Sequence, residues 1–170
     1  FSEIFNMILE TLGMTFISCG LAYLLGLPMG ILLNVTSKKG IMPCKWLNSI
    51  LSLVINILRS IPCLIIVVLL MQTVRDIFGR ATGEWYAIII PLFVTSFGFV
   101  SRMVEQSLAE VDNGKIEAIE SLGATKLQII TKVLLPESRA SLVSGLAVTL
   151  VSILGYTSFA YNIGAGGLIA

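Results

Sequence analysis

The sequence has 170 residues, of which 56% are hydrophobic and only 12% are charged, with a net charge of +1. Soluble domains carry about 25% charged residues, so this composition indicates a membrane protein. No basic cluster suggests a phosphate-binding face, and we expect no nucleic-acid partner. Histidine is absent and the three cysteines are irregularly spaced. The sequence therefore favours neither a metal site nor a disulfide framework, and we expect no catalytic residue and no metal.

The first apolar segment, Thr11 to Val35, is long enough to cross a membrane, because a spanning helix needs about 20 apolar residues. Pro28 lies inside it, which is tolerated where neighbouring helices satisfy the freed carbonyl. Gly26 and Gly30 form a GxxxG pair, which favours close contact with another helix.

The second apolar segment, Trp46 to Val74, is too long for one span and has Arg59 as its only charge. Pro62 disfavours helical backbone at Ile61. We expect a short interfacial helix up to Arg59, a break at residues 60–62, and a second span from the break to Val74.

Two further spans are predicted, from Trp85 to Ser101 and from Ser141 to Tyr156. Because no strand alternation recurs, we expect an all-α, polytopic helical membrane protein with at least four spans, forming a single domain over residues 1–170.

Lysine and arginine are unevenly distributed among the links between spans, and the links that are rich in them are usually cytoplasmic. The first link and the polar insert before the fourth span carry most of them, whereas the second link has Arg75 and Arg80. The residues on the predicted cytoplasmic side are Lys38, Lys39, Lys45, Arg102, Lys115, Lys126, Lys132 and Arg139. We therefore expect the insert inside and the N-terminus outside.

The polar insert, residues 112–136, reads as two short amphipathic helices joined at Gly123. Asp112 or Asn113 can cap the first helix, and a glycine commonly ends a helix in the left-handed conformation. Thr125 and Gln128 have capping-box spacing, so a second helix should begin there.

The second of these helices is expected to present Leu127, Ile130 and Leu134 on one apolar face. Pro136 either stops it or opens the fourth span. These features leave two alternatives: an interfacial linker between spans, or a docking element for a soluble partner.

The insert resembles the cytoplasmic signature of bacterial ABC importer permeases, which is Glu-Ala-Ala, three residues, Gly, nine residues, then Ile-x-Leu-Pro. Glu117, Ala118, Gly123, Leu135 and Pro136 match at the right spacing, while Ile119 and Val133 are mild departures. The runs Asn56 to Leu70, Ser101 to Val111, Lys132 to Glu137 and Gly164 to Leu168 are similar to the methionine-importer permeases of this superfamily. The stretch from Gly155 to Asn162 departs from them.

This resemblance implies a type I ABC importer permease fold, with a fifth span missing from these 170 residues, in a bacterial inner membrane. It implies a homodimer with two cytoplasmic ATPase subunits, which would bind ATP and Mg, and an extracytoplasmic substrate-binding protein. The sequence itself has no GxxxxGK[ST] motif for binding ATP, so we expect no cofactor on this chain. The substrate implied is methionine in its L or D form.

The resemblance makes the insert a coupling helix that docks on the ATPase. The residues expected to take part are Glu117, Ala118, Gly123, Ala124, Leu127, Ile130, Leu135 and Pro136. Those that either line the pathway or have a structural role are Arg59, Pro62, Tyr156, Phe159 and Tyr161.

Three alternatives remain open. The substrate could be another amino acid or small organic solute. An ion-coupled secondary transporter is disfavoured because the carboxylates lie in links or at span ends. Arg59 could simply extend to the lipid headgroups.

Overall fold

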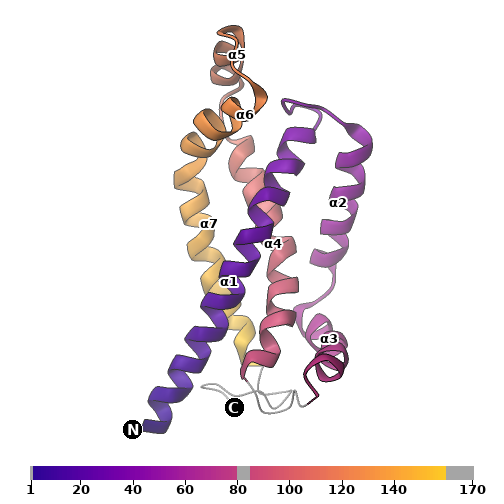
Figure 1. The fold of residues 1–170 in the computed structure, drawn as a ribbon, viewed down its shortest axis with the longest axis vertical. Helices are drawn as coiled ribbons and strands as arrows, with labels where there is room; N and C mark the ends of the chain where they lie inside the picture. Colours follow the sequence, from indigo (N-terminus) through magenta and orange to yellow (C-terminus); the bar gives the residue numbers. More distant parts are fainter. Residues whose placement is uncertain (1, 80–84, 160–170) are drawn as a thin grey trace.

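The computed structural model describes residues 2–79 and 85–159, and these are helical with short connections (Figure 1). The helices in chain order are α1 (Ser2–Thr36), α2 (Lys45–Ser60), α3 (Cys63–Phe78), the 3-10 helix η1 (Trp85–Ile88), α4 (Ile89–Ala109), α5 (Asn113–Ser121), α6 (Lys126–Ile129), the π-helix η2 (Ile130–Leu134) and α7 (Leu135–Tyr156). The all-α fold expected from the sequence is confirmed.

Three stretches of helix are long and apolar enough to cross a membrane: Ser2–Thr36, Tyr86–Ala109 and Lys126–Phe159. The pair α2 and α3 adds a fourth span if its two bent halves count as one. The first and third spans are longer than the sequence suggested, since α1 begins at Ser2 and α4 continues past Arg102 to Ala109.

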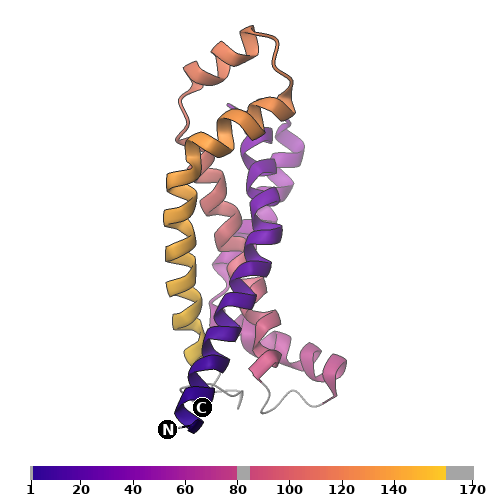
Figure 2. The same cartoon turned by 60° about the vertical axis from the view of Figure 1, so that its left-hand side comes forward.

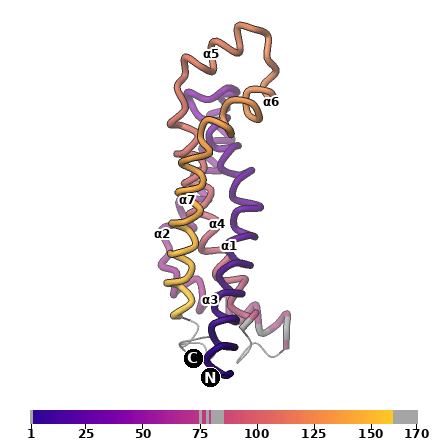
Figure 3. The backbone as a smooth tube through the Cα atoms, turned by 90° about the vertical axis from the view of Figure 1, so that its left-hand side faces the viewer, coloured from indigo at the N-terminus to yellow at the C-terminus, as the bar shows by residue number. Residues whose placement is uncertain are grey.

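Helix α4 is the centre of the bundle and packs against α1, α2, α3 and α7 (Figures 1 and 3). The contact with α1 runs through Gly26 and Gly30, whose missing side chains leave room for Val100 and Val104 of α4. The predicted GxxxG packing face is therefore real, and it brings α1 and α4 close together.

The break at residues 60–62 is confirmed, and the helices on its two sides run in different directions. Ile61 is extended, and α2 and α3 meet at 97°. Helix α2 runs alongside α1 and α4, whereas α3 turns away across the end of the bundle (Figures 1 and 2). Polar side chains of α2 hold it there: Asn48 donates to the carbonyl of Leu33 at 2.8 Å and Asn56 accepts from Arg102 at 2.8 Å.

The insert projects beyond the bundle, at the end opposite the start of α1 (Figures 2 and 3). Its second helix is not a separate element, because α6, η2 and α7 form one continuous helical stretch over Lys126–Phe159. Pro136 is among the first residues of α7, directly after the π-helix, so of the two expected roles it has the second.

Candidate functional site

The glycine elbow of the insert is a Schellman motif. The Gly123 N–H donates to the carbonyl of Glu120 at 3.0 Å, and the Ala124 N–H donates to the carbonyl of Ile119 at 3.3 Å. Gly123 has φ +82°, the left-handed conformation that this motif requires. A Cβ built on Gly123 would meet nothing within 4 Å. The backbone conformation, and not crowding, is therefore what calls for glycine here.

Side-chain caps define both helices that meet at the elbow. The Asp112 carboxylate accepts from the Gly114 N–H at 3.0 Å, which starts α5. Thr125 Oγ1 accepts from the Gln128 N–H at 3.4 Å, and Gln128 Oε1 accepts from the Thr125 N–H at 2.9 Å. The predicted capping box is confirmed, and it fixes the direction in which the chain leaves the elbow.

Two ion pairs close the insert into a loop. Lys126 of α6 pairs with Glu120 of α5 across the elbow, and Lys115 of α5 pairs with Glu137 of α7 at 2.6 Å. The hydrogen bond to Glu137 and the charge of that carboxylate raise the pKa of Lys115. All four side chains are about half exposed, so each pair is a modest tether.

The expected site residues do not share one face of the insert. Glu117, Ala118, Gly123, Leu127 and Pro136 are exposed, while Ala124 and Leu135 are half-buried. Ile130 is half-buried and packs against the core cluster that contains Leu108 and Leu134, so grouping it with Leu127 on one face is wrong.

Leu127 lies in the first turn of α6 beside the elbow, where it is exposed, whereas Ile130 lies one turn further along the chain and packs on the core. Sequence reasoning did not include Leu122 among the docking residues, although its side chain at the elbow is 86% exposed, more than the 70% of Leu127. A large apolar residue just before a predicted helix-ending glycine was the signal that could have found it.

Glu117 lines a cavity of about 490 Å³ between the insert and the turn after α1. Lys39 and Asn34 line the same cavity from the turn and the end of α1, and Lys126 lines it from α6. Glu117 therefore lies on the side of α5 that faces the bundle.

A second cavity, of about 410 Å³, gathers four of the five residues expected near a pathway. Arg59 and Pro62 line it from the bend between α2 and α3. Tyr156, at the end of α7, and Phe159, just after it, also line it. The two aromatic rings are stacked, with centroids 6.5 Å apart. Tyr161 lies outside the described residues.

Sequence reasoning did not identify the residues of α4 that line this cavity. Thr95 and Phe99 lie one turn apart on α4 and both line it. Their spacing of four in an apolar span was the available signal. Arg59 has no ion-pair partner among the described residues, so no carboxylate neutralises its charge where it lines the cavity.

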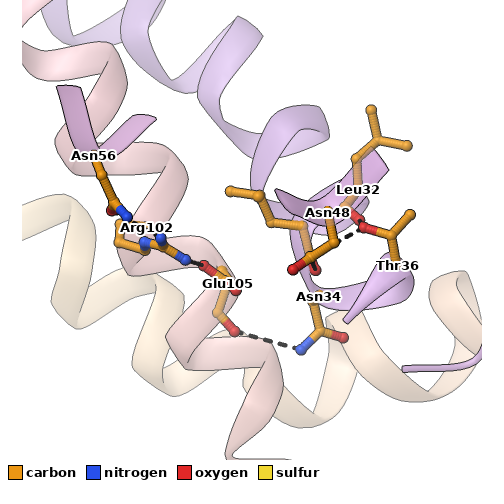
Figure 4. Close-up of polar contacts among 8 residues, drawn as sticks. Leu32, Asn34, Thr36, Asn48, Asn56, Arg102 and Glu105 are labelled. Atoms are coloured by element: carbon orange, nitrogen blue, oxygen red, sulfur yellow. Dashed lines mark hydrogen bonds and ion pairs between the residues drawn. The ribbon is translucent and has the colours of Figure 1, made fainter. Parts of the chain in front are cut away.

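A polar network ties α1, α2 and α4 together between this cavity and the insert (Figure 4). Arg102 pairs with Glu105 on α4 and donates to Asn56 Oδ1 of α2 at 2.8 Å. Asn34 of α1 donates to the backbone carbonyl of Glu105 at 3.4 Å. The helix that leads into the insert is therefore linked to both of its neighbours.

Candidate spanning helices surround the central helix α4, and a capped loop is held outside them. Residues 26–170 match the family described as the inner membrane component of binding-protein-dependent transport systems, and the chain belongs to this family. It is the permease subunit of an ABC importer and not an enzyme.

Two curated relatives illustrate the similarity. The chain is 40% identical to the probable D-methionine transport system permease protein MetI of Vibrio cholerae, over 94% of this chain and 70% of that protein. It is 44% identical to the D-methionine transport system permease protein MetI of Salmonella typhimurium, over 88% of this chain and 68% of that protein.

Solved structures agree with this assignment. An inward-facing conformation of the MetNI methionine ABC transporter has a chain 41% identical, with a TM-score of 0.93 over 98% of this chain and 77% of that one. A chain of an amino acid ABC transporter, 23% identical, matches with a TM-score of 0.79 over 99% of this chain and 75% of that one, which shows the shared fold.

Proposed function

We propose that this permease imports methionine, in its L or D form, by alternating access driven by ATP. The observation that carries the proposal is the match in sequence and shape to permeases of methionine transporters. The working complex would hold two copies of this chain, two cytoplasmic ATPase subunits that bind ATP and Mg, and an extracytoplasmic substrate-binding protein. Another amino acid or small organic solute is the alternative substrate.

The proposed orientation in the inner membrane puts the insert in the cytoplasm and the start of α1 outside. The basic turn with Lys38 and Lys39 follows the end of α1, at the same end of the bundle as the insert (Figure 1). Basic residues concentrate on the cytoplasmic side of membrane proteins, which supports this orientation.

The proposed contact with the ATPase is the elbow of the insert. Leu122 and Leu127 would enter a groove on the ATPase, with Gly123 and Ala124 allowing close approach of the backbone. Glu117 and Ala118 would flank the contact on α5. Ile130, Leu135 and Pro136 would serve as the base that joins the elbow to α7.

Displacement of the elbow would then move α4 and α7, because the insert joins these two helices and is closed by the Lys115–Glu137 pair. Rigid helices that switch between two packed arrangements are a known form of such motion. In this proposal ATP binding drives the elbows of the two copies together.

The cavity at the α2–α3 bend is the proposed part of the pathway. Arg59 offers a positive charge to a carboxylate, while Phe99, Tyr156 and Phe159 offer rings to an apolar side chain. A thioether also makes favourable contacts with aromatic rings. This combination of one cation and several rings suits the zwitterion of methionine.

The test is reconstitution of the complete transporter in liposomes, with uptake and ATP hydrolysis measured together. We expect L- or D-methionine, delivered by the binding protein, to stimulate hydrolysis more than other amino acids do. Gly123→Glu should reduce both activities, whereas Gly114→Ala on α5 should leave them unchanged. Equal activities for wild type and Gly123→Glu would mean that the insert is only a linker.

A further inference from the structure

Arg102 lies where α2 and α4 meet and is largely shielded. Its side chain and that of Glu105 are each 18% exposed. One Nη pairs with the Glu105 carboxylate, and the other donates to Asn56 Oδ1 of α2 at 2.8 Å. In the part of the chain that the structure describes, this is the one side-chain hydrogen bond found between α2 and α4.

The bond joins two functional regions of the permease. Asn56 lies one turn before Arg59, which lines the cavity at the α2–α3 bend. Arg102 lies two turns before Ala109, where α4 ends and the insert begins. The network in Figure 4 therefore lies on the path along α4 from the insert to the cavity.

Gly98, one turn before Arg102 in the chain, is a second point at which α4 contacts α2. A Cβ built on Gly98 would lie 3.3 Å from Leu58 Cβ and 3.3 Å from Arg59 Cγ, both on the part of α2 that lines the cavity. Gly98 thus lets α2 approach α4 closely, while Arg102 holds α2 in register. A glycine contact alone permits sliding, because van der Waals packing between helices carries no directional bond.

Helix α2 has a second polar attachment, at its other end. Asn48 donates to the Leu33 carbonyl at 2.8 Å and to Thr36 Oγ1 at 3.2 Å, which ties the start of α2 to α1. This attachment is remote from the cavity. The two ends of α2 are therefore held by different neighbours through different residues.

We propose that Arg102 is a positioning residue for transport: through Asn56 it makes the cavity-lining end of α2 follow α4 when the insert moves. The proposal rests on the function proposed above. Without this bond, α4 would move with the ATPase but the wall containing Leu58 and Arg59 would lag behind it. ATP would then be hydrolysed with fewer substrate molecules carried per cycle.

The decisive variant is Asn56→Ala, which removes the link but leaves the Arg102–Glu105 pair in place. In the complete transporter with its binding protein in liposomes, we expect the ratio of methionine transported to ATP hydrolysed to fall by about five-fold, a typical coupling between sites. Asn56→Asp keeps an acceptor for Arg102 and should restore the ratio. Arg102→Gln should lower the ratio as Asn56→Ala does.

Asn48→Ala is the matched control, because it removes a comparable polar link from the same helix away from the cavity. It should leave the transport-to-ATP ratio at the wild-type value. Thermal unfolding of each purified complex separates stability from coupling. An unchanged ratio for Asn56→Ala, or an equal fall for Asn48→Ala, would overturn the proposal.

The same assays distinguish failure of this proposal from failure of the proposed function. If the wild-type complex does not take up methionine but another amino acid stimulates its hydrolysis, the substrate is wrong, and the ratio is measured with that amino acid. If wild type transports and the Asn56 variants match it, the positioning role of Arg102 is wrong while the function stands.

Discussion

Gly30 of α1 lies against Val104 of α4 with no room for a side chain between them. A Cβ on Gly30 would lie 2.5 Å from the Cβ of Val104 and 2.7 Å from the carbonyl oxygen of Ser101. The second of these atoms belongs to the α4 backbone and cannot rotate away. The spacing of the first and third spans is therefore set by a missing methyl group.

Gly30→Ala should force α1 and α4 apart. Overpacking of this kind costs about 1–3 kcal/mol, and thermal unfolding of the purified permease should show it as a lower midpoint. Gly20→Ala is the control on the same helix, since a Cβ there meets nothing within 4 Å. Equal midpoints for the two variants would contradict the close contact at Gly30.

Gly123→Ala should loosen the elbow for a reason other than crowding. The left-handed backbone at φ +82° costs a residue with a Cβ about 1–2 kcal/mol. Gly123→Asn should cost less, because asparagine tolerates this conformation, and Gly123→Val should cost more. Amide hydrogen exchange across residues 119–124 measures the effect, and Gly114→Ala, at a helical position without positive φ, should not speed exchange there.

The elbow should separate residues needed for docking from residues needed for folding. Leu122→Asp and Leu127→Asp change exposed side chains, so stability should stay within about 0.5 kcal/mol, while capture of the ATPase subunit during purification is lost. Ile129→Ala changes a fully buried residue two positions after Leu127 and should cost about 2 kcal/mol or more. If Ile129→Ala abolished ATPase capture while the two leucine variants kept it, the leucines would not be the docking residues.

The Lys115–Glu137 tether should persist across the physiological pH range. The pKa of Lys115 is raised above its ordinary value of 10.5 by the hydrogen bond and the charge of Glu137. Stabilisation by this pair is therefore fully present from neutral pH up to 10.5 and is lost as the pH rises through the raised value. Salt should weaken it at neutral pH because both side chains are half exposed.

Protease nicking of the insert measures the strength of this tether. Lys115→Gln should increase nicking at pH 7.5 and make it less dependent on salt, because only the Lys126–Glu120 pair remains. The exchanged pair Lys115→Glu with Glu137→Lys should restore protection. Nicking of wild type that does not change with salt would mean that the pair adds nothing.

Cys63 reports on the proposed pathway cavity because it lines that cavity while half-buried. In a background with Cys44→Ser, which removes the exposed thiol, a small methanethiosulfonate reagent should label Cys63 and not the buried Cys19. Methionine with the binding protein and ATP should slow the labelling. Labelling that methionine leaves unchanged would place the route elsewhere.

The sequence predicted the insert well because its features are local. The capping box at Thr125 and Gln128 and the positive φ at Gly123 depend on residues within a few positions of one another. The Gly26–Gly30 face could also be read directly, since only small residues at this spacing allow close helix contact.

The arrangement of α2 and α3 could not be predicted because each has 16 residues, too few to span a membrane alone, and length does not say which of them joins the bundle. What decides between them is contact with residues far away in sequence: Asn56 with Arg102, and Leu58 with Gly98. The gathering of Thr95 and Phe99 with Arg59 at the cavity depends on the same helix placement.

The bonds that shape the elbow have a consequence for synthesis at the ribosome. Each of the Schellman and capping-box hydrogen bonds joins residues at most five positions apart, from Ile119 to Gln128. Bonds of such short range form quickly, without waiting for distant segments. The elbow can therefore take its final shape while α7 is still being translated, and only the Lys115–Glu137 pair has to wait for the next span to emerge.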